Sequence, residues 1–156
     1  MTGIDRIRDG LAAAEATGTR VWTPFHLILL SEALALTGKI EEGLAALDDA
    51  LAKAAISGVR GWDAEIHRLR GELTASLPYP DPAKTEDSFR TALAIAREQG
   101  TRGYELRAAT SLARLWREQR RQSEARELLA PVYDSFTEGF DTADLKDAKA
   151  LLDELA

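Results

Sequence analysis

The residue types that most often carry catalysis or hold metals are scarce in this chain, and they are not grouped. There is no cysteine among the 156 residues, which removes thiolate nucleophiles, thiolate metal sites and disulfides together. The two histidines, His26 and His67, stand 41 positions apart, and nothing in the sequence fixes further ligands beside them. Because no nucleophile is paired with a base, we predict no catalytic residue, no metal, no cofactor and no enzymatic activity.

Two short segments resemble ligand sites but lack essential features of them. Residues 37–39, Thr-Gly-Lys, are similar to the end of a phosphate-binding loop, but the earlier glycine and the hydroxyl residue after the lysine are missing. Asp141, Asp144 and Asp147 have a spacing that calcium loops do not use, and carboxylates near a helix start are favoured by the helix dipole. We therefore interpret the first segment as a turn and the second as a helix start.

A set of arginines is the most distinctive charged feature. Arg107, Arg114 and Arg117 recur at spacings that put them on one face of a helix. Guanidinium groups suit carboxylate or phosphate ligands, so this face predicts an anion-recognising site; a solvated arginine face is the alternative. The whole chain has a formal net charge of −6, which makes it a poor general ligand for nucleic acid or anionic lipid.

The sequence predicts a cytoplasmic location without a membrane partner. The N-terminus, Met1 to Asp5, has neither the basic start nor the apolar stretch of a signal peptide. No segment approaches the run of about 18 apolar residues that a spanning helix needs.

Internal repeats decide the predicted fold. The pattern Gly-x-Arg-x-aromatic occurs three times, starting at Gly18, Gly58 and Gly100, and each copy lies between two apolar-periodic segments. A glycine at such a point takes the left-handed conformation that ends a helix, and the aromatic residue then opens the next helix. The arginines of the motif, which we expect to meet the negative end of a helix dipole, are Arg20, Arg60 and Arg102.

Other positions keep nearly the same period. Small residues recur at Ser31, Gly71 and Ala113, in steps of 40 and 42. Two later sets step by 42 and then 40, namely Gly43, Thr85 and Ala125, and Leu47, Phe89 and Leu129. The first set takes its longer step one unit later than the other two sets do. This difference places two extra residues in the middle unit, where the proline-rich segment 77–82 lies. We predict the longest loop there, with Asp81 capping a helix that starts at Pro82.

The resulting prediction is an all-α chain of about eight helices without strands. The expected ranges are about 3–17, 22–37, 41–57, 62–77, 82–99, 103–119, 122–138 and 142–155. Short connections make neighbouring helices antiparallel. The first helix lines up with later second helices, so we expect a half repeat at 1–18, repeats at about 19–58, 59–100 and 101–139, and a capping helix at 140–156.

Small residues where paired helices cross, followed by large apolar residues, resemble the tetratricopeptide repeat in a form with longer helices. The segments 61–73 (GWDAEIHRLRGEL) and 105–119, with the ending 124–155, resemble the extreme C-terminal helical region of bacterial adenylate/guanylate cyclases that carry a predicted ATPase domain. The resemblance covers nearly the whole chain. It implies a right-handed solenoid of antiparallel helix pairs that acts as a regulatory or scaffolding region of a signalling protein. It carries over no cyclase or ATPase chemistry.

The first helix of each pair lines the concave surface in tetratricopeptide folds, so the resemblance also implies a face for a protein or peptide partner. By their distance from Ser31, Gly71 and Ala113, its residues are Phe25, Ile28, Glu32, Glu65, Arg68, Glu72, Arg107, Thr110, Arg114 and Arg117. The order predicts an apolar end, then acidic side chains, then basic ones. The alternatives are a small-molecule sensor or enzyme that uses this face, and an architectural domain that self-assembles. A homodimer through the N-terminal helix is a further expectation.

Overall fold

The chain is all-α in the computed structural model, which describes residues 2–18 and 21–156. Within these residues there are eight helices and no strand, as the repeat pattern predicts. The helices are α1 (Gly3–Ala16), α2 (Thr23–Leu36), α3 (Ile40–Ser57), α4 (Asp63–Ala75), α5 (Pro82–Gln99), α6 (Arg102–Glu118), α7 (Gln122–Asp134) and α8 (Ala143–Glu154). Arg20, one of the three motif arginines, lies outside the described residues.

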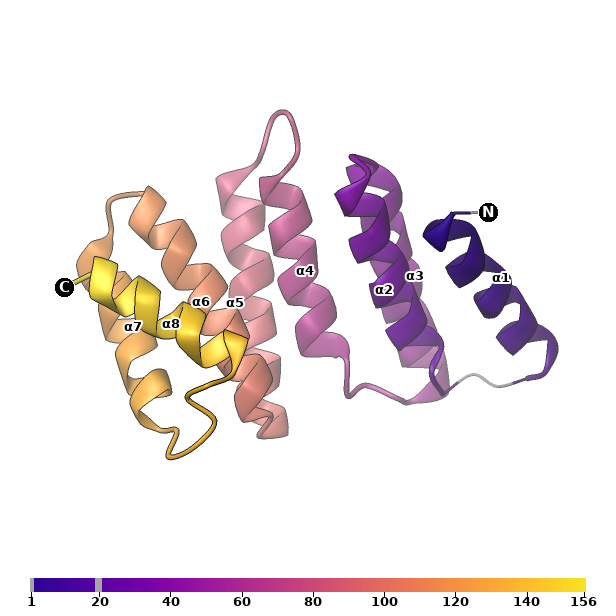
Figure 1. Ribbon diagram of the computed structural model, residues 1–156. Coiled ribbons are helices and arrows are strands. Elements are labelled where there is room, and N and C mark those ends of the chain that lie inside the picture. Colours follow the sequence, from indigo (N-terminus) through magenta and orange to yellow (C-terminus); the bar gives the residue numbers. More distant parts are fainter. Residues whose placement is uncertain (1, 19–20) are drawn as a thin grey trace.

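The helices pack as successive pairs in a row (Figure 1). α2 packs on α3, α4 on α5, and α6 on α7, while α1 lies against α2 at one end and α8 against α6 and α7 at the other. The two chain ends therefore lie at opposite ends of the row. One apolar cluster joins α1 to α4 and a second joins α5 to α8. No helix in the described part of the chain is long and apolar enough to cross a membrane.

Paired helices approach closely where the sequence repeats small residues. A Cβ atom added to Gly43 of α3 would lie 3.2 Å from the carbonyl oxygen of Ser31 in α2. A Cβ atom added to Gly71 of α4 would lie 2.5 Å from the ring of Phe89 in α5. The alignment of these positions in the sequence thus corresponds to real helix crossings, where small side chains let two backbones come together.

The helices end and begin near the glycine and capping residues that the sequence predicts. Gly18, Gly58 and Gly100 have φ angles of 73°, 73° and 66°, in the left-handed region that glycine adopts at little cost. Asp81 caps α5, because its Oδ1 atom accepts hydrogen bonds from the backbone N–H groups of Ala83 and Lys84 at 3.0 and 3.2 Å.

The prediction of the longest connection was wrong. The segment between Asp134 and Ala143 is longer than the proline-rich one, because α7 ends before residue 138. Tertiary contacts account for this early end: the Arg102 guanidinium donates to the backbone carbonyl of Ser135 and lies over the ring of Phe136, 5.0 Å from its centroid. Arg102 does meet a helix C-terminus, but that of α7.

We predict that Gly71→Ala lowers the free energy of unfolding by about 1–3 kcal/mol, because the new methyl group overlaps the buried ring of Phe89. The other two pairs have Leu47 and Leu129 at the Phe89 position, so Phe89→Leu should restore much of the loss in the double variant. Urea denaturation measures both effects. Gly61→Ala is the matched control, since nothing lies within 4 Å of a Cβ atom there. Equal stability of Gly71→Ala and Gly61→Ala would contradict the crossing.

Arg120 provides a second prediction, because it is the one non-glycine residue of the described chain with a positive φ, 62°. It occupies the α6–α7 turn at the place that Gly38 holds in the α2–α3 turn, and both turns close with the same backbone hydrogen bonds. We expect Arg120→Gly to raise the free energy of unfolding by about 0.5–1 kcal/mol, from relief of left-handed strain less the extra freedom of the unfolded chain. Gly38→Arg should lower it. A less stable Arg120→Gly variant in thermal melts would show that the arginine side chain contributes more than the strain costs.

Candidate functional site

The predicted partner face is contributed by α2, α4 and α6, and the structure divides it into a charged part and an apolar part. Ile28, Glu65, Arg68 and Thr110 are all buried, so these four predicted contact residues offer little surface to a partner. The Thr110 hydroxyl donates to the backbone carbonyl of Leu106 at 2.8 Å. Glu65 and Arg107 meet between α4 and α6, Glu32 lies on α2, and Phe25 lies in an aromatic cluster at the start of α2.

A buried carboxylate organises the charged part. Glu65 is 5% exposed and accepts two hydrogen bonds from Arg68, at 2.8 and 2.9 Å. The same carboxylate pairs with Arg107 of α6 at 2.7 Å. Glu72 accepts from Arg68 at 3.2 Å and from the Ser111 hydroxyl at 2.6 Å. These bonds link α4 to α6 with balanced charge.

The electrostatics of Arg68 match this arrangement. Burial by itself would lower the pKa of a guanidinium, but the hydrogen bonds and charge of Glu65, with the charges of Glu72 and Glu32, raise the pKa of Arg68 above its usual value. The arginine is therefore firmly cationic and is held by carboxylates of its own helix. The Arg68 guanidinium therefore belongs to the contact between helix pairs, and it is little available to a ligand.

The arginines of α6 also find carboxylates inside the molecule. Arg107 lies 3.7 Å from Asp144 of α8, and Arg117 pairs with Glu154, which also belongs to α8. Arg114 lines a cleft of about 120 Å³ together with Asp144 and Asp147. The structure thus does not show the separate acidic and basic stretches that the sequence predicted, because α8 brings acids to the basic helix.

An exposed aromatic cluster lies at the apolar end of the predicted face. The ring of Phe25 lies 5.0 Å from that of Trp62 and 6.4 Å from that of Trp22, and the two tryptophan rings are 6.2 Å apart. Trp22 is 54% exposed although it contacts two other rings. The sequence predicts that Trp22 and Trp62, the aromatic residues of the first two motif copies, open helices. Both do open helices, but Trp22 also presents a large apolar surface to solvent.

The exposed surface continues along α2. Leu29 and Leu36 are 37% and 90% exposed, and with Trp22 and Phe25 they follow one side of the helix. We call this side the α2 stripe; its residues are Trp22, Phe25, Leu29, Ala33 and Leu36. Glu32 is its only acidic neighbour on the helix. A helix that is apolar on nearly all sides is normally covered on all sides.

The next helix pair shows what kind of contact the α2 stripe lacks. Ile66, Leu69 and Leu73 of α4 stand 40 residues after His26, Leu29 and Ala33, and all three are buried in the apolar cluster that joins α1 to α4.

Leu73 illustrates the contact: its Cδ1 atom lies 3.1 Å from the place that a Cβ atom on Gly43 would take. α4 thus packs this side on the first helix pair. α1 precedes α2 and packs against it, and Ile4, Ile7 and Leu11 of α1 belong to the apolar cluster that α2 shares. The exposed apolar residues of the first helix pair thus include Leu29 and Leu36 of α2.

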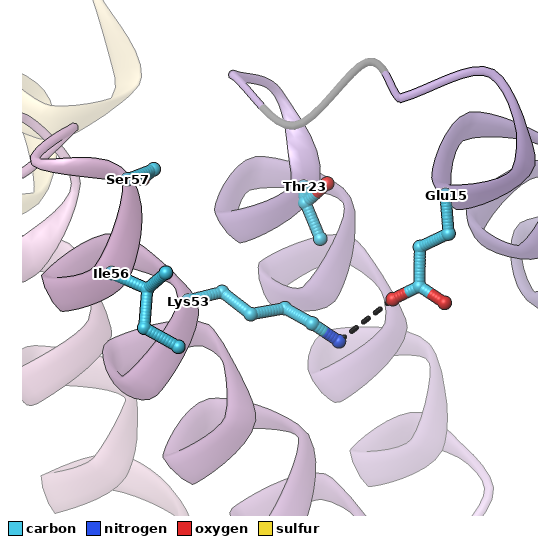
Figure 2. Close-up of a pocket in the computed structure, with 5 residues that line it drawn as sticks. All are labelled: Glu15, Thr23, Lys53, Ile56 and Ser57. Atoms are coloured by element: carbon cyan, nitrogen blue, oxygen red, sulfur yellow. Dashed lines mark hydrogen bonds and ion pairs between the residues drawn. The ribbon is translucent and has the colours of Figure 1, made fainter.

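A pocket of about 360 Å³ lies between the C-terminal ends of α1 and α3 and the start of α2 (Figure 2). Its one amine, Lys53, donates to Asp49 and to Glu15, each at 2.8 Å. The hydrogen bonds from Asp49 and then Glu15 raise the pKa of Lys53 above its usual value. A lysine nucleophile needs the opposite shift, so Lys53 is not prepared for covalent chemistry.

Comparison with known proteins adds one relative. No protein-family model matches the chain. The chain is 31% identical over 114 residues to a protein of Rhizobium meliloti (strain 1021) that is described as uncharacterized. The alignment covers 73% of this chain but only 11% of the relative, which is therefore about 1,000 residues long. The chain thus spans about one ninth of the curated relative that it matches.

His67 gives this region a predicted pH dependence. Burial, then the charges of Arg70 and Arg60, lower the pKa of His67 below 6.5, against a weaker opposite effect of Asp63. The unfolded chain then binds more protons between the two pKa values. The stability that neutral His67 gives the folded chain is complete above about pH 6.5. It is lost as the pH falls through the pKa of His67 in the folded chain.

We expect His67→Leu, which copies Leu27 of the first pair, to reduce the loss of stability between about pH 7.5 and pH 5.5. The measurement is the urea midpoint of both proteins at each pH. If the urea midpoint falls between the two pH values by the same amount in both proteins, His67 is not the group that titrates.

Proposed function

We propose that the chain is a tetratricopeptide-like solenoid that holds another protein through the α2 stripe and the aromatic cluster beside it. The observation that carries this proposal is the exposed side of α2, where Trp22, Leu29 and Leu36 remain in solvent, while Leu69 and Leu73, the α4 counterparts of Leu29 and Ala33, are buried. Tryptophan and other large apolar side chains dominate the binding energy of protein interfaces. The all-α pairs, their period and their helix crossings are compatible with the solenoid.

The charged part of the face has a supporting role in this proposal. Its carboxylates and guanidinium groups satisfy one another between α4, α6 and α8, so a partner would have to break existing ion pairs to bind there. Breaking a buried pair leaves an uncompensated charge, which is costly. A partner therefore gains more at the apolar end, where only water is displaced.

We further propose that the chain acts as a regulatory or scaffolding part of a larger signalling protein, in the manner of the cyclase-associated helical regions that it resembles. Support comes from the relative of about 1,000 residues, in which a segment of this kind forms a small fraction of the whole. A module that carries an exposed apolar side contributes most simply by contact with other protein.

The test is affinity capture with the immobilised chain from a lysate of the organism that encodes it. Trp22→Ser and Leu36→Ser change exposed side chains, so they should preserve the fold while weakening capture about tenfold or more. Tyr79→Ser is the matched control, because Tyr79 is 95% exposed in the α4–α5 loop, outside the α2 stripe. If all four proteins capture the same partners equally, the α2 stripe is not the binding surface.

A further inference from the structure

We propose that the α2 stripe binds the α2 stripe of a second copy of this chain, with the two helices antiparallel and a twofold axis passing beside Leu29. This inference rests on the proposed function, because it names the protein that covers the exposed side of α2. The axis brings each residue of α2 opposite the partner residue that lies equally far on the other side of Leu29, so that the two residue numbers add up to 58. Leu29 then meets its own copy, Trp22 meets Leu36, and Phe25 meets Ala33.

The sizes of these side chains fit such a contact. The large ring of Phe25 lies opposite the small side chain of Ala33, which leaves room for it between two helices about 8–10 Å apart. At the two ends of the stripe, Trp22 lies opposite Leu36, and these are its two most exposed large side chains. Each end therefore covers Leu36 and the part of Trp22 that remains in solvent.

Charge favours the antiparallel direction. Glu32 is the one carboxylate beside the stripe, and no lysine or arginine occurs on α2. In a parallel pair of helices the two Glu32 side chains would stand at the same level, with no cation of α2 between them. The antiparallel pair separates them along the axis, each at the level of the partner's residue 26, and it also opposes the two helix dipoles favourably.

The opposite end of the molecule explains why association should stop at two copies. The exposed side of α8 carries Lys146, Asp147, Lys149 and Asp153, and Lys149 already pairs with Asp153 at 2.7 Å. A charged surface of this kind does not cover the apolar α2 stripe, so head-to-tail stacking is disfavoured. Two copies of the α2 stripe that cover each other give a closed dimer.

The size of the contact predicts a weak dimer. Trp22, Leu29 and Leu36, with the neighbouring Val21, leave on the order of 300 Å² of apolar surface on each copy. Stable interfaces bury about 800 Å² per partner. We therefore expect reversible association, with monomer at about 1 µM and dimer in the range of about 100 µM to 1 mM.

Sedimentation of the full chain over this concentration range tests the association. The average mass should rise from one chain to two and stop there. Leu36→Asp, at a 90% exposed position, and Leu29→Asp should each weaken association by about tenfold or more, while Tyr79→Asp should associate like the unchanged chain. A monomer at every concentration, growth beyond two copies, or association unaffected by Leu36→Asp would overturn the proposal.

Cross-linking tests the direction of the helices, and the lack of native cysteine makes single-cysteine variants unambiguous. With a short bis-maleimide, Leu29→Cys should cross-link to its own copy. Leu36→Cys should not, because residues 29 and 36 lie about 10 Å apart along the helix, which puts the two Leu36→Cys sites about 20 Å apart in an antiparallel pair. Self-cross-linking of Leu36→Cys would instead establish a parallel pair and overturn this geometry.

The two proposals can fail separately. If the chain stays monomeric but Trp22-dependent capture of another protein persists, the second copy is the wrong occupant and the proposed function stands. If the chain neither associates nor captures protein through Trp22, both proposals are overturned.

Discussion

The close approach of two helices within each pair is the constraint on which the remaining packing depends. Ser31 and Gly43 let α2 and α3 touch almost backbone to backbone, and Gly71 lets the ring of Phe89 lie against the backbone of α4. A crossing of this kind fixes which side of each helix faces its partner. The remaining sides must then be buried by the preceding or following pair, or stay in solvent. The properties of the surface therefore follow from the crossings.

Contacts between successive pairs differ in chemistry along the molecule. The second pair packs on the first mainly through aliphatic residues such as Leu69 and Leu73. The third pair meets the second also through the buried Glu65 carboxylate, which two guanidinium groups share. Such ion pairs add little net stability relative to apolar contacts, but their geometry is exacting, and losing one partner is costly. The arginines that look like ligand-binding groups in the sequence are thus engaged in holding helix pairs together.

The two ends of the row are finished differently. α8 turns charged residues outward, which is how repeat proteins end a stack without leaving an apolar surface. α2 has no equivalent cover on the side that carries Leu29 and Leu36. The α2 stripe is therefore more open to association than the charged outer side of α8. That asymmetry supports both the proposed binding of protein and the proposed antiparallel dimer.

The local sequence was sufficient to predict the helices and their crossings. Gly58 and Gly100 end helices because their backbone conformation is costly for other residues, and that cost can be recognised within a few positions. The repeat also predicted a helix crossing at Gly71, but the side chain that lies against it is the large ring of Phe89. Arg120 shows the limit of local reasoning: the tertiary turn imposes a left-handed conformation on a residue type that seldom adopts it.

The partners of the charged side chains were decided only by the tertiary structure. Arg107 meets Glu65 from 42 residues away and Asp144 from 37, and no pattern along one helix indicates which distant carboxylate will approach. The exposure of Trp22 has the same origin, since it depends on which helix lies ahead of α2. Helical periodicity depends on the nearest turns of the chain, whereas ion pairing and burial depend on how separate helices pack in space.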